Sequence, residues 1–104
     1  MKEALRSSEA QKDVEGIVSY YSKQSLSVSN RFIDEYQAAI REIERMPGIG
    51  SLRFAYTLDI ANVRSLALHD FPYLIFYFER EDHIDVARVL HSHQDIFNLL
   101  LGID

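Results

Sequence analysis

The first half of the chain carries two apolar stripes with helical spacing. The first stripe runs from Ser8 to Ser22 and the second from Val28 to Ile43. In both, apolar residues recur three or four positions apart, which is typical of amphipathic helices. The polar segment Lys23 to Ser27 predicts the turn between them, Ser27 or Ser29 is expected to cap the second helix, and Pro47-Gly48 is expected to end it. The sequence therefore predicts a helical hairpin.

The second half of the chain changes to a strand-like pattern. Its segments are rich in Val, Ile, Tyr, Phe and Leu and are separated by short polar or proline-containing breaks. Tyr73 to Phe78 is apolar on both faces, as expected for a central strand, and the short connection Glu79 to Asp82 favours antiparallel pairing with the next strand. The opening segment, Lys2 to Arg6, is a candidate for a further strand. The predicted strands of this half are Leu52 to Leu58, Asn62 to Leu68, Tyr73 to Arg80 and His83 to His91.

A short helix is expected at the end of the chain. Ser92 and Asp95 have the spacing of a capping box, and the apolar segment Ile96 to Gly102 follows them. This segment is too apolar to be fully solvated, so it packs on the sheet or is covered by a partner. We predict a single α+β domain over residues 1–104, in which the N-terminal helical hairpin packs on a three- to four-stranded antiparallel sheet.

The charge balance, the absence of cysteine and the length of the apolar runs exclude several classes of function. The 104 residues include 11 basic and 16 acidic side chains, for a net charge of −5, and no cysteine. No lysine follows Lys23, and residues 53–104 carry four arginines against eight acidic residues. Nucleic-acid binders usually have a basic excess, so no direct contact with nucleic acid is expected. The chain also has no apolar run long enough to span a membrane, and we expect a cytoplasmic protein without disulfides.

Two groups of residues are candidates for chemistry. His91, His93 and Asp95 offer donors of the kind that zinc prefers, but a helix cap at Ser92 would part the two imidazoles, so we predict no metal and no cofactor. A nuclease site needs a general base, a general acid and cations beside the phosphate. The residues that could supply such a site are Arg64, Arg88, His91 and Tyr77.

Three motifs give the chain a resemblance to a known family. They are the aromatic helix ending Ile17-Val18-Ser19-Tyr20-Tyr21, the strand Phe71-Pro72-Tyr73-Leu74-Ile75-Phe76-Tyr77, and Arg88-Val89-Leu90-His91 followed closely by Asp95. In this order and spacing, and with Pro47-Gly48 after the second helix, the chain resembles the ParE branch of the RelE/ParE toxins. The resemblance extends from about Leu5 to Leu100.

The resemblance implies the toxin component of a type II toxin–antitoxin system, held in a hetero-oligomer by a ParD-like antitoxin. RelE-type members cut mRNA on the ribosome, whereas ParE-type members inhibit DNA gyrase without a recognised catalytic centre. The acidic second half favours gyrase inhibition through protein–protein binding. A RelE-like, ribosome-dependent mRNA endoribonuclease is the alternative. A weakened or non-toxic protein-binding member is a third possibility, because Gln94 stands where the family often has arginine.

Contacts to the target or the antitoxin are expected from arginine, histidine, tyrosine and leucine side chains near the sheet rim and the last helix. Arg and Tyr are favoured anchors at protein interfaces. The residues predicted to make these contacts are Arg53, Arg64, Tyr73, Tyr77, Arg88, His91, His93, Leu99 and Leu100.

Overall fold

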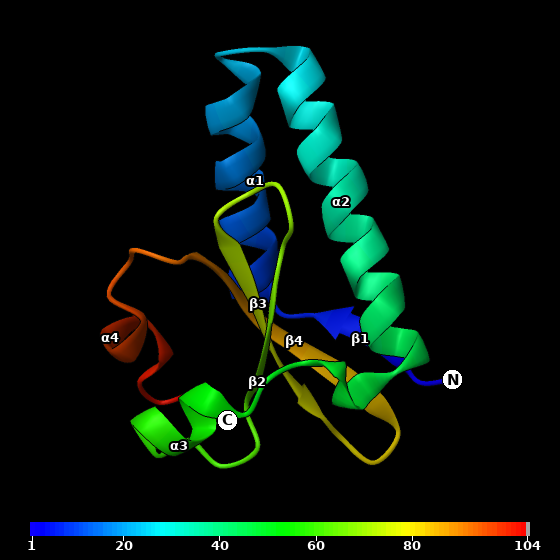
Figure 1. Ribbon diagram of the computed structural model, residues 1–104, viewed down its shortest axis with the longest axis vertical. Helices are drawn as coiled ribbons and strands as arrows, with labels where there is room; N and C mark the ends of the chain where they lie inside the picture. Colours follow the sequence, from blue (N-terminus) through cyan, green and yellow to red (C-terminus); the bar gives the residue numbers. More distant parts are fainter. Residues whose placement is uncertain (104) are drawn as a thin grey trace.

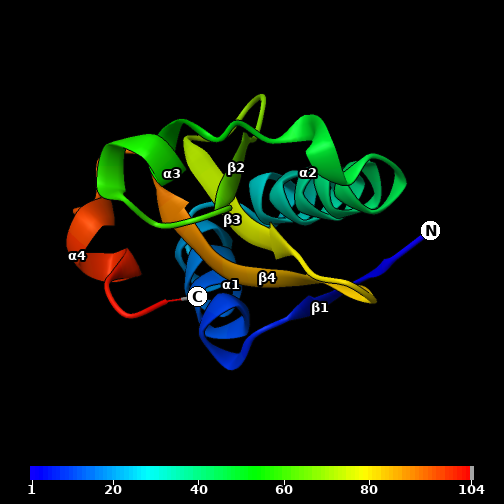
Figure 2. The same ribbon diagram turned by 90° about the horizontal axis from the view of Figure 1, so that it is seen from below.

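A four-stranded sheet separates two helical layers in the computed structural model, which describes residues 1–103 (Figures 1 and 2). A long helical hairpin covers one face of the sheet, and two short helices lie together on the other. This arrangement confirms the predicted α+β class. The elements are β1 (Glu3–Arg6), α1 (Ser8–Ser22), α2 (Leu26–Arg45), the 3-10 turn η1 (Pro47–Ile49), α3 (Arg53–Leu58), β2 (Arg64–Ala67), β3 (Tyr73–Glu79), β4 (His83–His91) and α4 (Ile96–Leu100).

The sheet has the strand order β1-β4-β3-β2. Strands β2, β3 and β4 pair antiparallel, as predicted, and β3 and β4 are the central strands. The N-terminal strand instead joins β4 in parallel, with Glu3 opposite His83, so the sheet is mixed rather than wholly antiparallel. A parallel edge requires a long crossover, which the helical hairpin and the other strands supply.

A serine caps the N-terminus of each helix of the hairpin. Ser7 caps α1 by accepting a hydrogen bond from the Ala10 backbone N–H. Ser25 caps α2, accepting from the Val28 N–H, so the expectation of Ser27 or Ser29 was wrong. Ser25 can cap the helix because its backbone is extended. Ser29 is instead buried within the helix, where its hydroxyl contacts that of Ser22 at 3.0 Å and joins the two helices.

Each face of the sheet has its own apolar core, because successive strand residues point to opposite faces. On the hairpin side, Ile75 and Tyr77 of β3 pack with Phe32 of α2. On the other side, Phe76 and Phe78 pack with Leu100 of α4. All six side chains are buried, which confirms that β3 is central and that the last helix packs on the sheet.

One predicted strand is wrong: Leu52 to Leu58 contains helix α3. The segment alternates like a strand, but Phe54, Ala55 and Leu58 also have helical spacing, and these three side chains pack against the core beneath α4. Tyr56, which an amphipathic strand would bury with Phe54, is 80% exposed. Burial of the helical stripe therefore decides the conformation.

The start of α4 also differs from the prediction. Asp95, not Ser92, caps the helix by accepting from the Asn98 N–H, while the Ser92 N–H donates to the Pro72 carbonyl. Ser92 is thus tied to the β2–β3 loop, and the helix begins only at Ile96. Within residues 1–103, no helix combines the length and apolar character needed to cross a membrane.

The loop between α2 and α3 is fixed by two of the predicted site residues. The Tyr77 hydroxyl donates to the Pro47 carbonyl at 2.7 Å and accepts from the Gly50 N–H at 2.9 Å. The Arg64 guanidinium donates to the Gly50 carbonyl at 2.8 Å and to the Gly48 carbonyl at 3.3 Å. The side chains of Tyr77 and Arg64 therefore fix the backbone of this loop, which does not belong to the sheet ladder or to a long helix.

We predict that Gly50→Ala destabilises this loop. A Cβ at Gly50 would lie 2.6 Å from the Tyr77 hydroxyl oxygen, whereas a Cβ at Gly48 meets nothing within 4 Å. Because the Tyr77 ring is buried and cannot swing away, we expect Gly50→Ala to lower the free energy of unfolding by about 1–3 kcal/mol. Gly48→Ala is the control and should change it by less than about 0.5 kcal/mol. Urea unfolding measures both, and equal effects would contradict the proposed clash.

Candidate functional site

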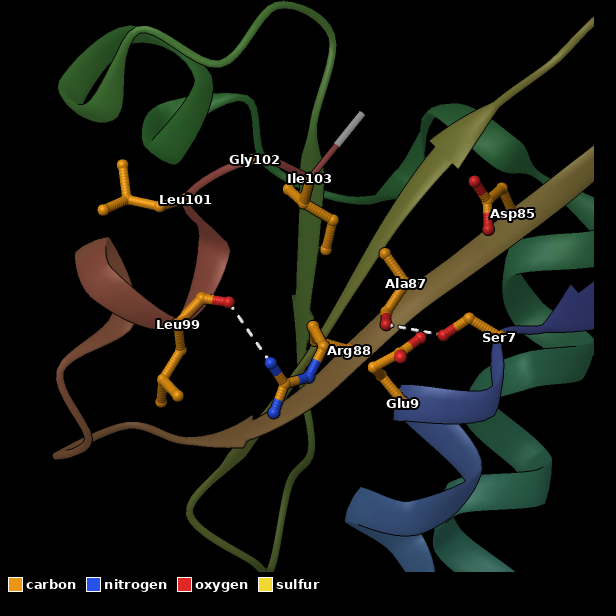
Figure 3. A pocket seen from close by; sticks show the side chains of 9 residues that line it. All are labelled: Ser7, Glu9, Asp85, Ala87, Arg88, Leu99, Leu101, Gly102 and Ile103. Carbon is orange, nitrogen blue, oxygen red and sulfur yellow. Dashed lines mark hydrogen bonds between the residues drawn. The ribbon is translucent and has the colours of Figure 1, made fainter.

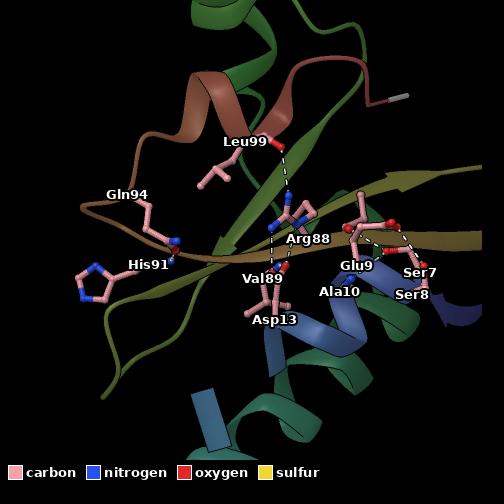
Figure 4. Close-up of polar contacts among 11 residues, drawn as sticks. Ser7, Ser8, Glu9, Ala10, Asp13, Arg88, Val89, His91, Gln94 and Leu99 are labelled. Atoms are coloured by element: carbon pink, nitrogen blue, oxygen red, sulfur yellow. Dashed lines mark hydrogen bonds and ion pairs between the residues drawn. The ribbon is translucent and has the colours of Figure 1, made fainter. Parts of the chain in front are cut away.

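Arg88, the arginine of the family-like motif, is held by an ion pair inside the molecule. Its Nε and Nη2 donate to the two carboxylate oxygens of Asp13 at 2.8 and 2.9 Å, a bidentate arrangement across β4 and α1 (Figure 4). The Val89 N–H also donates to Asp13, at 2.9 Å. The side chains of Arg88 and Asp13 are only 19% and 14% exposed. The hydrogen bonds that Arg88 donates to the Asp13 carboxylate raise the pKa of Arg88 above its ordinary value.

The same guanidinium reaches the last helix. Its Nη1 donates to the Leu99 carbonyl at 3.2 Å. A hollow of about 370 Å³ lies beside this contact, between the start of α1, the outer edge of β4 and the chain after α4 (Figure 3). Glu9 and Asp85 line it together with Arg88. With Asp13 included, the charges around this hollow sum to a net negative value, which does not suit a phosphate.

The four residues of the possible nuclease site do not form one site. Arg64 lies opposite Tyr77 in the sheet, and His91 lies opposite Tyr73. These two pairs lie four positions apart on β3, a distance of about 13 Å along an extended strand. Arg64 and Tyr77 hold the Pro47–Gly50 loop, and Arg88 is paired with Asp13. A phosphate could not contact all four side chains at once.

His91 and His93 lie close together at the end of β4. Their ring centroids are 5.4 Å apart, and Nδ1 of His91 accepts the His93 backbone N–H at 3.0 Å, so the expectation that the turn parts them was wrong. The chain turns after His91, whose own N–H donates to the Gln94 side chain at 2.6 Å. Among residues 1–103, no group of three His, Asp or Glu side chains is placed to hold a metal ion.

The predicted contact residues differ in exposure. Arg53 and His93 are exposed, whereas Tyr77 and Leu100 are buried and reach no surface. The other five are half-buried: Arg64, Tyr73, Arg88, His91 and Leu99. Sequence reasoning missed the structural role of Asp13, although a carboxylate between Ala10 and Ile17 of the apolar stripe was a detectable signal for a paired charge.

Sequence reasoning also missed several exposed apolar side chains on the two short helices. Tyr56 of α3 is 80% exposed, and Phe97 and Leu101 at α4 are 49% and 60% exposed. The two helices lie side by side (Figures 1 and 2), and a hollow of about 420 Å³ opens between the end of α3 and α4. Arg53 stacks over the Phe54 ring at 4.6 Å. We call Arg53, Tyr56, Phe97 and Leu101 the α3–α4 surface.

Comparison with known proteins decides the family. Residues 5–96 match the family model described as "ParE toxin of type II toxin-antitoxin system, parDE". The chain belongs to the ParE toxin family. A solved structure described as "Chromosomal ParDE TA system from P. aeruginosa" is similar in fold, with a TM-score of 0.73 at 15% identity, covering 88% of this chain and 96% of that one. No curated protein matches the chain.

We predict that Asp13→Asn destabilises this ParE-family chain and loosens α4. The variant leaves the Arg88 guanidinium without its carboxylate, so we expect the free energy of unfolding to fall by about 2 kcal/mol. Glu9→Gln removes a neighbouring, exposed carboxylate of α1 and should cost less than about 0.5 kcal/mol. Hydrogen exchange should quicken in α4 of Asp13→Asn only. Identical behaviour of the two variants would refute the special role of Asp13.

A further prediction concerns alkaline pH. Burial, with Tyr21 nearby, raises the pKa of Tyr73 to about 12. Because the folded pKa exceeds the unfolded value of about 10, the stabilisation by neutral Tyr73 is complete below pH 10 and is lost as the pH rises towards 12. Ultraviolet titration of the wild type and of Tyr73→Phe should therefore differ by one late-titrating phenol. A Tyr73 phenol that ionises near pH 10 would contradict the assignment.

Proposed function

We propose that this ParE-family chain is the toxin component of a bacterial toxin–antitoxin system, and that it inhibits DNA gyrase in the cytoplasm through protein–protein binding. One observation favours gyrase inhibition over mRNA cleavage. The arginines that a nuclease would need already bind other groups within the fold. Arg88 is paired with Asp13, and Arg64 holds the backbone of the Pro47–Gly50 loop. The ion pair withdraws Arg88 from a phosphate transition state, and the Nη1 of Arg64 is engaged by the loop backbone.

The α3–α4 surface is the proposed contact with gyrase. Exposed apolar side chains that lie together mark protein interaction sites, and Tyr and Arg are enriched among the residues that dominate binding energy. Tyr56 and Arg53 are both exposed and lie within one short helix. His93 is exposed on the loop that leads to α4, but its ring lies 5.4 Å from that of His91, so it belongs with the second candidate interface and not with this one.

A ParD-like antitoxin is the proposed second partner and would hold the toxin in a hetero-oligomer. The half-buried residues Tyr73, His91 and Leu99 from the predicted contact set are candidates for the antitoxin interface. Tyr73 and His91 pack edge to face at 5.2 Å beside a hollow of about 350 Å³ that is also lined by Tyr20 and Lys12. Tyr77 and Leu100 support these surfaces from the core.

The proposal is tested with purified gyrase and the purified chain. We expect loss of supercoiling and accumulation of cleaved plasmid. Tyr56→Ala and Arg53→Ala should each weaken inhibition by about fivefold or more, as for interface residues whose truncation costs at least about 1 kcal/mol. Tyr20→Ala removes another exposed tyrosine, on the hairpin, and should leave inhibition unchanged.

Expression of the chain alone, under tight control, tests the toxic activity in cells. Filamentation with DNA-damage signalling would support gyrase inhibition. Rapid arrest of translation with cut transcripts would instead support the ribosome-dependent endoribonuclease. Unaffected growth in the presence of abundant folded chain would overturn both toxin functions and leave a non-toxic binding protein.

A further inference from the structure

One edge of the sheet is closed by side chains. Strand β1 pairs with β4 only as far as Val86, and beyond it three side chains bond the backbone of β4 in place of a strand. The Ser7 hydroxyl donates to the Ala87 carbonyl at 2.8 Å, Asp13 accepts from the Val89 N–H, and Gln94 accepts from the His91 N–H. No extended segment can add to β4 there without displacing these groups.

The opposite edge, formed by β2, is only partly closed. Ser65 exchanges both backbone hydrogen bonds with Ser51, at 2.8 and 2.9 Å, and Figure 2 shows the segment after η1 running beside β2. Since backbone groups alternate in direction along an antiparallel strand, the N–H and C=O of Ala67 point the same way as those of Ser65. Ala67 is exposed, and within residues 1–103 these two groups have no hydrogen-bond partner. Neither proline nor lysine protects this edge.

A groove of about 180 Å³ runs beside this open edge, between β2 and α2. Ala38 and Ala39 of α2 leave room for a chain to approach, and Glu35 and Glu42 lie two helical turns apart on the same helix. The Glu35 carboxylate accepts the Asp70 N–H, and Glu42 forms a solvent-exposed ion pair with Arg45 at 3.0 Å. No lysine or arginine lines the groove, whose residues are Glu35, Ala38, Ala39, Glu42, Ile49, Leu66, Ala67, Leu68 and His69. The groove therefore combines free backbone groups, an apolar floor and negative charge.

A second copy of the chain fits this edge poorly. Symmetric pairing of two β2 edges would bring Glu35 and Glu42 of one copy towards the same residues of the other. Like charges at close range are destabilising, and the net charge of −5 adds to the repulsion. A segment of opposite charge has no such cost.

We propose that the β2 edge at Ala67 binds a short extended segment in which lysine or arginine alternates with small apolar residues, as a fifth strand of the sheet. The backbone of the segment would pair with Ala67, its apolar side chains would lie over Ala38 and Ala39, and its basic side chains would face Glu35 and Glu42. This mode of recognition takes affinity from main-chain hydrogen bonds and specificity from alternate side chains. It stands on the groove itself and is independent of gyrase inhibition.

The probe is a synthetic eight-residue peptide of alternating valine and lysine, compared with one of alternating valine and glutamate, both capped at their ends. Fluorescence anisotropy with the full chain should show binding of the lysine peptide at least about tenfold tighter than of the glutamate peptide. Amide exchange at Ala67 should slow on saturation with the lysine peptide. Exchange at Val89, on the closed edge, should stay unchanged.

Two variants separate the backbone and charge contributions. Ala67→Pro removes the outward N–H at a position where an edge strand tolerates proline, and should weaken binding by about fivefold. Glu42→Gln should weaken binding of the lysine peptide by about two- to fivefold, whereas Glu81→Gln, an exposed acid on the β3–β4 turn, should not change it. An unprotected Ala67 amide at saturation, equal binding of both peptides, or equal effects of Glu42→Gln and Glu81→Gln would each overturn the proposal. So would a dimer that forms through β2 in analytical ultracentrifugation.

Discussion

The carboxylate of Asp13 is the constraint on which the arrangement of α1, β4 and α4 depends. It accepts from the Arg88 guanidinium twice and from the Val89 N–H once, so a single side chain satisfies the edge of β4 and orients Arg88. Once oriented, Arg88 donates to the Leu99 carbonyl and ties the last helix to the sheet. Such a pair is costly to break, because either partner alone would be a poorly solvated charge. The hairpin and the C-terminal helix are thus coupled through one arginine, although they cover opposite faces of the sheet.

This coupling also explains why an arginine in a family-like position need not be a catalytic group. A guanidinium stabilises a phosphate only when its donors are free and the surrounding potential is positive. Here each nitrogen of the Arg88 guanidinium already donates a hydrogen bond within the fold, and acidic residues line the neighbouring hollow. The chain as a whole is also acidic. The proposed interactions therefore depend on surface shape, on exposed aromatic and aliphatic side chains and on the few arginines that remain outside the core.

The sequence was sufficient to predict an element wherever its apolar pattern is long and regular and its apolar side chains all face the same core. The hairpin, the doubly buried strand β3 and the bounds of β4 follow directly from apolar spacing. Helix α3 does not follow from apolar spacing, because the positions of Phe54 and Leu58 fit both a strand and a helix. Contact with the core beneath α4 decides between the two conformations. The parallel pairing of β1 and the Asp13–Arg88 pair join residues about 80 positions apart, which no local pattern can specify. The candidate site was therefore the least predictable part of the chain.

The two edges of the sheet show how such long-range contacts define where a partner can bind. An unpaired strand edge invites aggregation unless it is short or covered. Around β4 the covering groups come from α1 and from the turn after the strand, so closure follows from the packing that stabilises the fold. Around β2 the cover ends at Ser65, because the bridge from Ser51 is antiparallel and the residues that precede Ser51, which run towards Ala67, are coiled in η1 and not extended. The opening is limited to the backbone next to Ala67 and is bordered by acidic residues of α2, which restricts pairing to segments of suitable charge.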